Sequence, residues 1–338
     1  MRLVAATLVL FMGLPIVARA AITPAPLALL QSQLSAMSMR APGHIGLEIQ
    51  DLATGLTSSV NAGVSMPAAS TIKIPVMVEV FRQLALGSFD LNMRVRLRAS
   101  DKDWGSGSIC DAHAGTGFPV SQLLTAMITV SDNTAANMLI RLVGRARINR
   151  TMAELGLHHT KLADFIRTDG WGIRNTLRSS PADMVRLLSK MAHDKLIDEW
   201  SSRQMIAILE ADQINTLVPQ PLPTDLQIAH KTGSLDDTLN DVGIVYAGRE
   251  PYVIAVMTTG LPSLGAGRRF IRKVSRTAYD DLLNFADWRD ANGMTLPITP
   301  QADAQETQTN TPTDAPFWGQ NPVATPKPHP TSDPNGGG

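Results

Sequence analysis

The stretch from Met66 to Phe81 reads MPAASTIKIPVMVEVF. Its only basic residue, Lys73, lies three positions after Ser70. An apolar run with helical character follows, so a helix is predicted to begin at or near the serine, with both side chains on one face. A serine nucleophile needs a nearby base, and a lysine in apolar surroundings has a lowered pKa. The stretch therefore fits a nucleophile and its base, although Ser70 as a helix N-cap and Lys73 as a surface residue fit it too.

Two further polar stretches interrupt apolar sequence. Residues 131–133 read SDN, which fits either a helix N-cap or a loop that points a hydroxyl and an amide into a cleft. Residues 231–234 read KTGS, which fits an ordinary turn or a strand edge. A glycine at a strand edge lets a ligand approach the backbone closely. Each motif alone is weak, so their combination and order decide the interpretation.

The order of predicted elements favours a sheet built from both ends of the chain. HIGLEIQDL and LTSSV, after an amphipathic helix over Pro26–Met39, read as two strands, and DVGIVY and YVIAVMTT read as two more. Helix-type spacing recurs between them, and a final helix is predicted from about Arg269 to Trp288. These patterns predict an α+β fold with a helical lobe over about 70–210.

S-x-x-K, S-D-N and K-T-G, in this order, are characteristic of class A β-lactamases and penicillin-binding proteins. From about His44 to Trp288 the sequence resembles the penicillin-recognising serine acyl-transferases, and most closely the class A β-lactamase family. The resemblance implies a β-lactamase/transpeptidase-like fold, in which an antiparallel sheet is flanked by helices.

The resemblance also implies roles for the matching residues. The implied catalytic residues are Ser70, Lys73, Ser131 and Lys231. The implied substrate-binding residues are Asn133, Thr232, Gly233 and Ser234. In that reading Ser70 attacks the carbonyl of a β-lactam or an acyl-D-alanine, Lys73 takes or relays its proton, and Ser131 passes a proton to the leaving nitrogen. Backbone N–H groups of Ser70 and Ser234 would form the oxyanion hole.

The sequence departs from the family where class A enzymes carry the glutamate that hydrolyses the acyl-enzyme. Matching TKLADFI to the family pattern places Ile166 near that position. Asp164 or Asp169 could substitute, Lys73 could serve both steps, or the acyl-enzyme could persist; Asn175 could position a water. Both aspartates also fit plain loop capping or surface ion pairs.

The family's usual arginine near the substrate carboxylate is also missing after Ser234. Three arginines near the final helix are candidate stand-ins: Arg268, Arg269 and Arg272.

The ends of the chain differ from its middle. Residues 1–20 read as a secretory signal peptide, because an apolar run too short to span a bilayer precedes a small-x-small cleavage site. The catalytic domain is expected over 21–290, and residues 291–338 form a Pro/Thr-rich tail expected to be disordered. These features predict a periplasmic or secreted protein with no stable membrane insertion after cleavage.

Thirty basic residues balance thirty acidic ones, so the chain carries no charge footprint for nucleic acid. The seven histidines form no metal spacing, and Cys110, the only cysteine, is expected to be buried; no metal and no cofactor are predicted. We expect a monomeric serine hydrolase that opens β-lactam rings. The alternatives are a D-alanyl-D-alanine peptidase or transpeptidase and a penicillin-binding protein with slow turnover.

Overall fold

The computed structural model describes residues 24–168 and 176–293. The signal peptide expected over 1–20 and nearly all of the tail expected over 291–338 lie outside these ranges, as do Asp169 and Asn175. Within them no helix is both long and apolar enough to cross a membrane.

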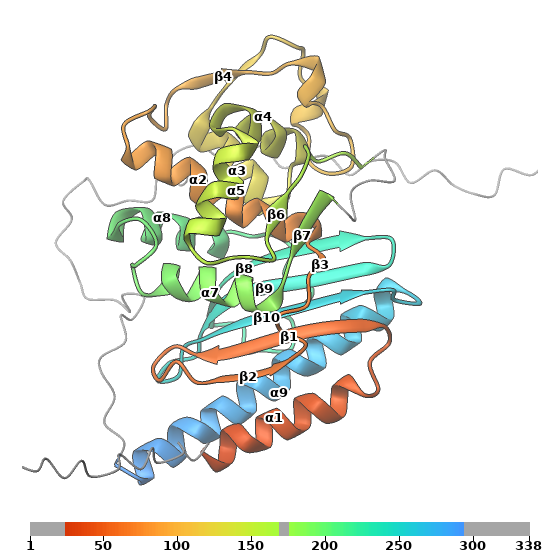
Figure 1. Ribbon diagram of the computed structural model, residues 1–338, viewed down its shortest axis with the longest axis vertical. Helices are drawn as coiled ribbons and strands as arrows, with labels where there is room; N and C mark the ends of the chain where they lie inside the picture. Colours follow the sequence, from red (N-terminus) through yellow and green to blue (C-terminus); the bar gives the residue numbers. More distant parts are fainter. Residues whose placement is uncertain (1–23, 169–175, 294–338) are drawn as a thin grey trace, which may run out of the picture.

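A five-stranded antiparallel sheet forms the middle layer (Figure 1), and it joins the two ends of the chain as predicted. Its strands, in spatial order, are β2 (Thr57–Val60), β1 (His44–Asp51), β10 (Tyr252–Thr259), β9 (Thr238–Tyr246) and β8 (Gln227–Leu235). β1 pairs with β10 along its whole length. β8, which carries the KTGS motif, lies at one edge of the sheet, so of the turn and the strand that the sequence left open the structure has the strand.

Helices cover both faces of this sheet, and that explains why the central strands are almost completely buried. Every residue of β9 except Tyr246, and every residue of β10 except Thr259, is buried. One face packs against α1 (Ala25–Ser38) and α9 (Leu264–Ala291). α9 begins five residues earlier than predicted, because Ser263 caps it by accepting a hydrogen bond from Ala266 N.

The other face packs against the helical lobe, which contains the larger apolar cluster. The α-helices on this side are α2 (Lys73–Ala85), α3 (Val120–Thr129), α4 (Asn133–Val143), α5 (Arg145–Glu154), α7 (Pro181–Ala192) and α8 (Glu199–Glu210). Three single turns of 3₁₀ helix complete it: η1 (Ala69–Ile72), η2 (Ala99–Asp101) and η3 (Ile109–Asp111). Cys110 is buried in η3, as predicted.

Short strands tie the lobe together. They are β3 (Met66–Pro67), β4 (Arg94–Arg96), β5 (Gly117–Pro119), β6 (Lys161–Leu162) and β7 (Leu177–Ser179). β7 pairs with both β3 and β6, and so fixes the segment that leads into Ser70.

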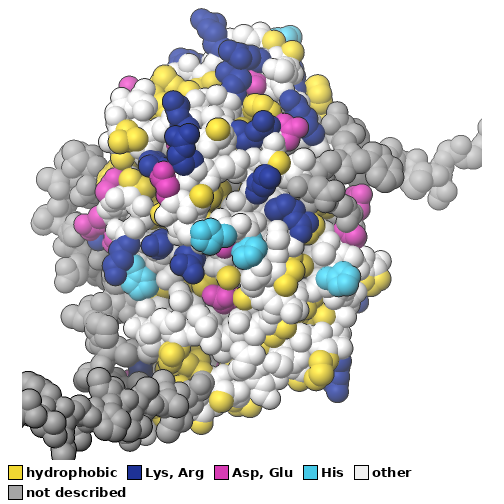
Figure 2. All heavy atoms as spheres, viewed as in Figure 1, with side chains coloured by type: hydrophobic (Ala, Val, Ile, Leu, Met, Phe, Trp, Pro, Cys, Tyr) yellow, Lys and Arg dark blue, Asp and Glu magenta, His cyan; other side chains and the backbone are white. Residues whose placement is uncertain are grey.

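Basic side chains are spread over the helical lobe, with acidic ones among them (Figure 2). Several of them form exposed ion pairs, such as Arg82–Glu154 and Arg145–Asp164. Exposed pairs typically contribute only about 0–1 kcal/mol each. The two apolar clusters therefore dominate the stability of the fold.

Candidate active site

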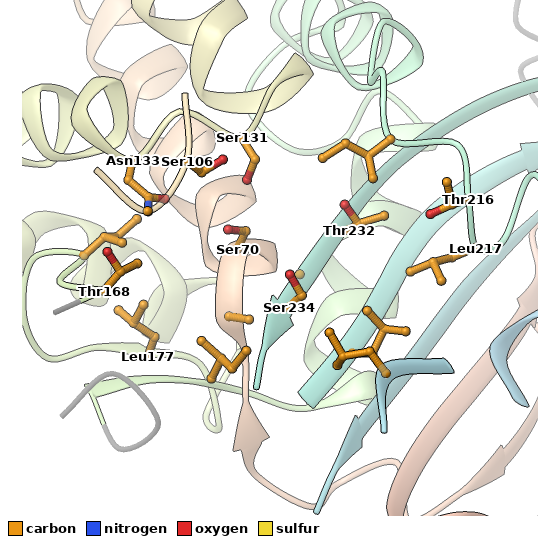
Figure 3. Close-up of a pocket in the computed structure, with 18 of the residues that line it drawn as sticks. Ser70, Ser106, Ser131, Asn133, Thr168, Leu177, Thr216, Leu217, Thr232 and Ser234 are labelled. Atoms are coloured by element: carbon orange, nitrogen blue, oxygen red, sulfur yellow. The ribbon is translucent and has the colours of Figure 1, made fainter. Parts of the chain in front are cut away.

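Ser70 lies in η1, directly before α2, so the helix begins beside the serine as the sequence predicted. Its side chain lines a cavity of about 250 Å³ (Figure 3). The preceding residue, Ala69, has a φ of 48°, in the left-handed region that costs a non-glycine residue on the order of 1–3 kcal/mol. This strained turn is held because Asn240 Nδ2 donates to Pro67 O (2.9 Å) and to Ala68 O (3.1 Å).

Lys73 is completely buried, which excludes the surface interpretation. Its Nζ donates to Asn133 Oδ1 at 2.7 Å, to Ser131 Oγ at 3.0 Å and to the Ser131 carbonyl oxygen. Burial lowers the pKa of Lys73 well below its usual value, and the nearby cation of Lys231 lowers it further. This lowering of the Lys73 pKa agrees with the prediction of a lysine that can give up its proton.

The expected direct contact between Ser70 and Lys73 is not a hydrogen bond here. Ser131 and Asn133 occupy all three donor positions of the Lys73 ammonium, and the Ser70 hydroxyl has no hydrogen-bond partner among the described residues. Ser131 instead lies between the lysine and the cavity, and Figure 3 shows its side chain on the same cavity as that of Ser70.

The SDN motif serves both functions that the sequence left open. Asp132 is the N-cap of α4 and accepts a hydrogen bond from Ala135 N at 2.7 Å. Ser131 has a φ of 59°, a second left-handed non-glycine residue at this site. Ser131 and Asn133, on either side of the cap, both line the cavity.

Asp103 fixes the orientation of Asn133, and sequence reasoning missed it. Asn133 Nδ2 donates to Asp103 Oδ1 at 2.8 Å, so its oxygen must face Lys73. Asp103 also accepts hydrogen bonds from Thr168 N (2.7 Å), Thr168 Oγ1 (2.8 Å) and Gly105 N (3.0 Å). Burial opposes its ionisation, but these hydrogen bonds outweigh burial and hold the pKa of Asp103 below its usual value. A fixed anion therefore lies directly behind the amide.

The KTGS motif places β8 against the serine. An added Cβ at Gly233 would lie 2.9 Å from Ser70 N and 3.0 Å from Ala68 O. Only glycine lets the strand approach η1 this closely, which gives the predicted glycine a specific reason. Thr232, Gly233 and Ser234 all line the cavity.

Lys231 points away from solvent and pairs with Asp212, with 3.4 Å between Nζ and Oδ2. Both side chains are completely buried. Burial lowers the pKa of Lys231, and Asp212 acts in the opposite direction. Lys231 does not line the cavity itself, so it can act on the cavity only through its charge.

Outside the three motifs, most residues that line the cavity are apolar. Its lining residues outside the three motifs are Ala69, Gly105, Ser106, Ile166, Thr168, Leu177, Ile214, Thr216, Leu217, Leu235, Leu239, Leu264 and Arg268. Arg268 is therefore the one of the three candidate arginines that reaches the cavity. Arg272 instead donates to Thr216 O at 2.9 Å.

Ile166 lines the cavity, in agreement with its predicted placement. Its side chain is buried, and Asn137 holds its backbone through Ile166 N (2.8 Å) and Ile166 O (3.0 Å). Asp164 is exposed and pairs with Arg145 at 3.0 Å, so it is a surface ion-pair residue and the suggestion that it replaces the glutamate is wrong. Among the described residues that line the cavity, none is acidic.

Comparison with known proteins gives the family of the chain. The model of the Beta-lactamase enzyme family matches residues 29–282. The chain belongs to the β-lactamase enzyme family. It is 31% identical to the β-lactamase from Sphaerobacter thermophilus, over 76% of this chain and 96% of that one, with a TM-score of 0.68.

Two other solved structures are also similar to this chain. One is an acyl-enzyme complex of penicillin G with a leucine-to-glutamate variant of PBP-A, 30% identical over 76% of this chain and 97% of that one (TM-score 0.72). The other is an ancestral (GNCA) class A β-lactamase, 26% identical over 74% of this chain and 99% of that one (TM-score 0.68). The β-lactamase-type fold and family expected from the three motifs are thus confirmed.

Proposed function

We propose that this β-lactamase-family protein is an exported serine hydrolase that opens β-lactam rings through an acyl-enzyme on Ser70. The observation that carries the proposal is the convergence of Ser70, Ser131 and the edge of β8 on one cavity, above a buried lysine with a lowered pKa. The N-terminal sequence supports export to the periplasm or the exterior.

In the acylation step the Ser70 oxygen attacks the lactam carbonyl carbon, so a C–O bond forms and the ring C–N bond breaks. Neutral Lys73 has only two N–H groups, so one of its three Nζ contacts opens and its lone pair takes the Ser70 hydroxyl proton. Ser131, whose Oγ lies 3.0 Å from Lys73 Nζ, gives its own proton to the departing nitrogen and regains one from Lys73. Backbone N–H groups of Ser70 and Ser234 hold the oxyanion, a contribution of typically about 10²–10³ in rate per donor.

Residues beside the serine would recognise the rest of the substrate. Asn133 Nδ2 keeps one N–H beyond its bond to Asp103, and it binds the side-chain amide of the substrate. Thr232 and Ser234 hydrogen-bond the substrate carboxylate, while Lys231 and Arg268 supply positive charge.

Deacylation is proposed to be slow. It needs a polarised water near the ester, yet the wall at the glutamate position is the apolar Ile166, and no acidic side chain among the described residues lines the cavity. This observation favours the second candidate, a penicillin-binding protein with slow turnover or a D-alanyl-D-alanine peptidase. Asp169, outside the described residues, stays a candidate base.

One experiment separates these functions. Purified protein, residues 21–338, is incubated with a chromogenic cephalosporin while colour and intact mass are followed together. Continued turnover without a lasting adduct supports the β-lactamase, and a stable adduct without turnover supports the slow penicillin-binding protein. Ser70→Ala should abolish both signals, and if it changes neither, the assignment of the nucleophile is wrong.

A further inference from the structure

The loop between α8 and β8 forms one wall of the cavity. Three of its residues, Ile214, Thr216 and Leu217, line that cavity, and Figure 3 shows Thr216 and Leu217 beside the strand that carries Thr232. A loop without regular secondary structure holds such a wall only if other contacts fix its backbone.

Backbone contacts hold part of this loop, since Arg272 donates to Thr216 O and Gln213 N donates to Thr129 O. Three further anchors, which involve the sheet strands or the loop's own side chains, alternate with the wall residues. Asp212, at the start of the loop, pairs with Lys231 and accepts a hydrogen bond from Ile214 N at 2.9 Å. Asn215, in the middle, has its Oδ1 2.9 Å from His230 Nε2. Val218, at the end, donates its N–H to Asp241 Oδ2 at 2.8 Å. The second and third anchors both depend on one buried pair, His230 and Asp241.

The contacts of His230 favour a ring with two protons. Nδ1 lies 2.9 Å from Asp241 Oδ1, and Nε2 lies 2.9 Å from Asn215 Oδ1. The Asn215 amide cannot be reversed without losing a bond, because its Nδ2 donates to Asp212 O at 3.0 Å. A neutral imidazole has a single N–H and could satisfy only one of these acceptors, whereas the imidazolium satisfies both.

The charges around the ring favour the same form. Asp241 from β9 faces it directly, Asp212 from the loop adds a second negative charge, and Lys231, the next residue on β8, opposes them. Burial disfavours the cation most strongly, but the carboxylates outweigh it, so the pKa of His230 is raised above its usual value. Asp241 is completely buried, so solvent does not screen this pair.

The neighbouring strand makes room for this arrangement. Gly243 on β9 lies opposite His230, and an added Cβ there would lie 2.5 Å from His230 Cβ. The glycine therefore permits the close strand approach that brings His230 and Asp241 together.

We propose that His230 is a positioning residue: a buried imidazolium, paired with Asp241, that pins the 212–218 loop to the sheet and so shapes the substrate-binding wall of the cavity. Deprotonation removes one of its two hydrogen bonds and loosens the middle of the loop, where the bond from Arg272 to Thr216 O remains. Substrate binding should then weaken as pH rises through the pKa of His230, while the chemistry at Ser70 is retained. The binding consequence rests on the proposed function, but the protonation state does not.

The protonation state is tested directly by ¹⁵N NMR of the histidine side chains across a pH titration of the full exported chain. His230 should show the imidazolium signature above pH values of about 6.5, where an ordinary histidine is half neutral. Asp241→Asn should bring the titration of His230 to lower pH. A neutral His230 ring at pH 6 would overturn the proposal, whatever the protein does with β-lactams.

The positioning role is tested by acylation kinetics with benzylpenicillin. His230→Asn should raise the concentration for half-maximal acylation about tenfold, as expected for loss of a charge-assisted hydrogen bond, and should remove the alkaline weakening of binding. His193→Asn is the matched control. Both ring nitrogens of His193 also lie near oxygens, Ser189 O (2.7 Å) and Leu52 O (3.1 Å), but none of these residues lines the cavity. An unchanged pH profile in His230→Asn, or in Asp241→Asn if the first variant does not fold, would refute the role. Absence of any acylation in the wild type would refute the proposed function instead.

Discussion

Replacing Ile166 by glutamate should convert a persistent acyl-enzyme into one that hydrolyses quickly. The side chain already lines the cavity, and Asn137 holds the backbone of residue 166 on both sides, so a glutamate would enter the cavity from a fixed position. The carboxylate could then take a proton from a water that attacks the ester.

The expected size follows from general-base catalysis, which typically contributes about 10²–10⁴ in rate. At about 1.36 kcal/mol for each factor of ten, the barrier to deacylation should fall by roughly 3–5 kcal/mol. Loss of the buried isoleucine side chain should destabilise the fold by about 2–5 kcal/mol, although the variant keeps the backbone bonds of this segment.

The assay is a pulse of benzylpenicillin, rapid removal of free ligand, and intact-mass measurement of the adduct over time. Ile166→Gln is the matched control, because it has nearly the same shape as the glutamate but cannot accept a proton at neutral pH. Ile166→Glu should shorten the adduct lifetime at least about a hundredfold relative to Ile166→Gln. Equal lifetimes in the wild type and both variants would show that residue 166 is not beside the ester.

Three further predictions test other parts of the site. Lys73→Arg keeps the charge but cannot lose its proton, so acylation by benzylpenicillin should fall about 10²–10⁴-fold in stopped-flow measurements. Because the pKa of Lys73 is lowered, wild-type acylation should be present above that pKa and lost as pH falls through it. An acylation rate that does not fall at acidic pH would contradict this. Asp103→Asn should slow acylation by freeing the Asn133 amide and should lower the free energy of unfolding by about 1–3 kcal/mol in chemical denaturation. Thr168→Val removes one of the four hydrogen bonds to Asp103 and should cause a smaller loss. The lowered pKa of Asp103 stabilises the fold above about pH 4, and this stabilisation is lost as pH falls through the folded-state pKa, so Asp103→Asn should lose part of the acid dependence of stability. Arg268→Ala should raise the benzylpenicillin concentration for half-maximal acylation about tenfold with the limiting rate kept, and an unchanged value would remove this arginine from the carboxylate site.

The sequence predicted those features of the site that depend on short motifs. The start of the helix at Ser70 and the placement of Ile166 follow from local patterns and family spacing, whereas the KTGS motif left a turn and a strand edge open. What it could not predict are partners that tertiary packing brings together. Asp103 meets Asn133 across 30 residues and Lys231 meets Asp212 across 19, and no spacing rule indicates either contact.

The same limit explains the errors. Asp164 is acidic and close to the expected position, but its side chain faces Arg145 on the surface, and sequence alone does not tell which way a loop residue points. His230 looked like one of several scattered histidines, because the acceptors for its two nitrogens come from β9 and from the loop after α8.

The pairing of β1 with β10 has a consequence for how the protein is made. The partners are more than 200 residues apart, so the first strand emerges from the ribosome long before the strand that completes its ladder. Such non-local strand pairing is slow. Until the β1–β10 ladder forms, the chain has no complete sheet against which the helical lobe can pack. A nascent chain that stays open until its last third is synthesised is well suited to threading through a secretion channel, and a truncation before Tyr252 should leave nothing that folds.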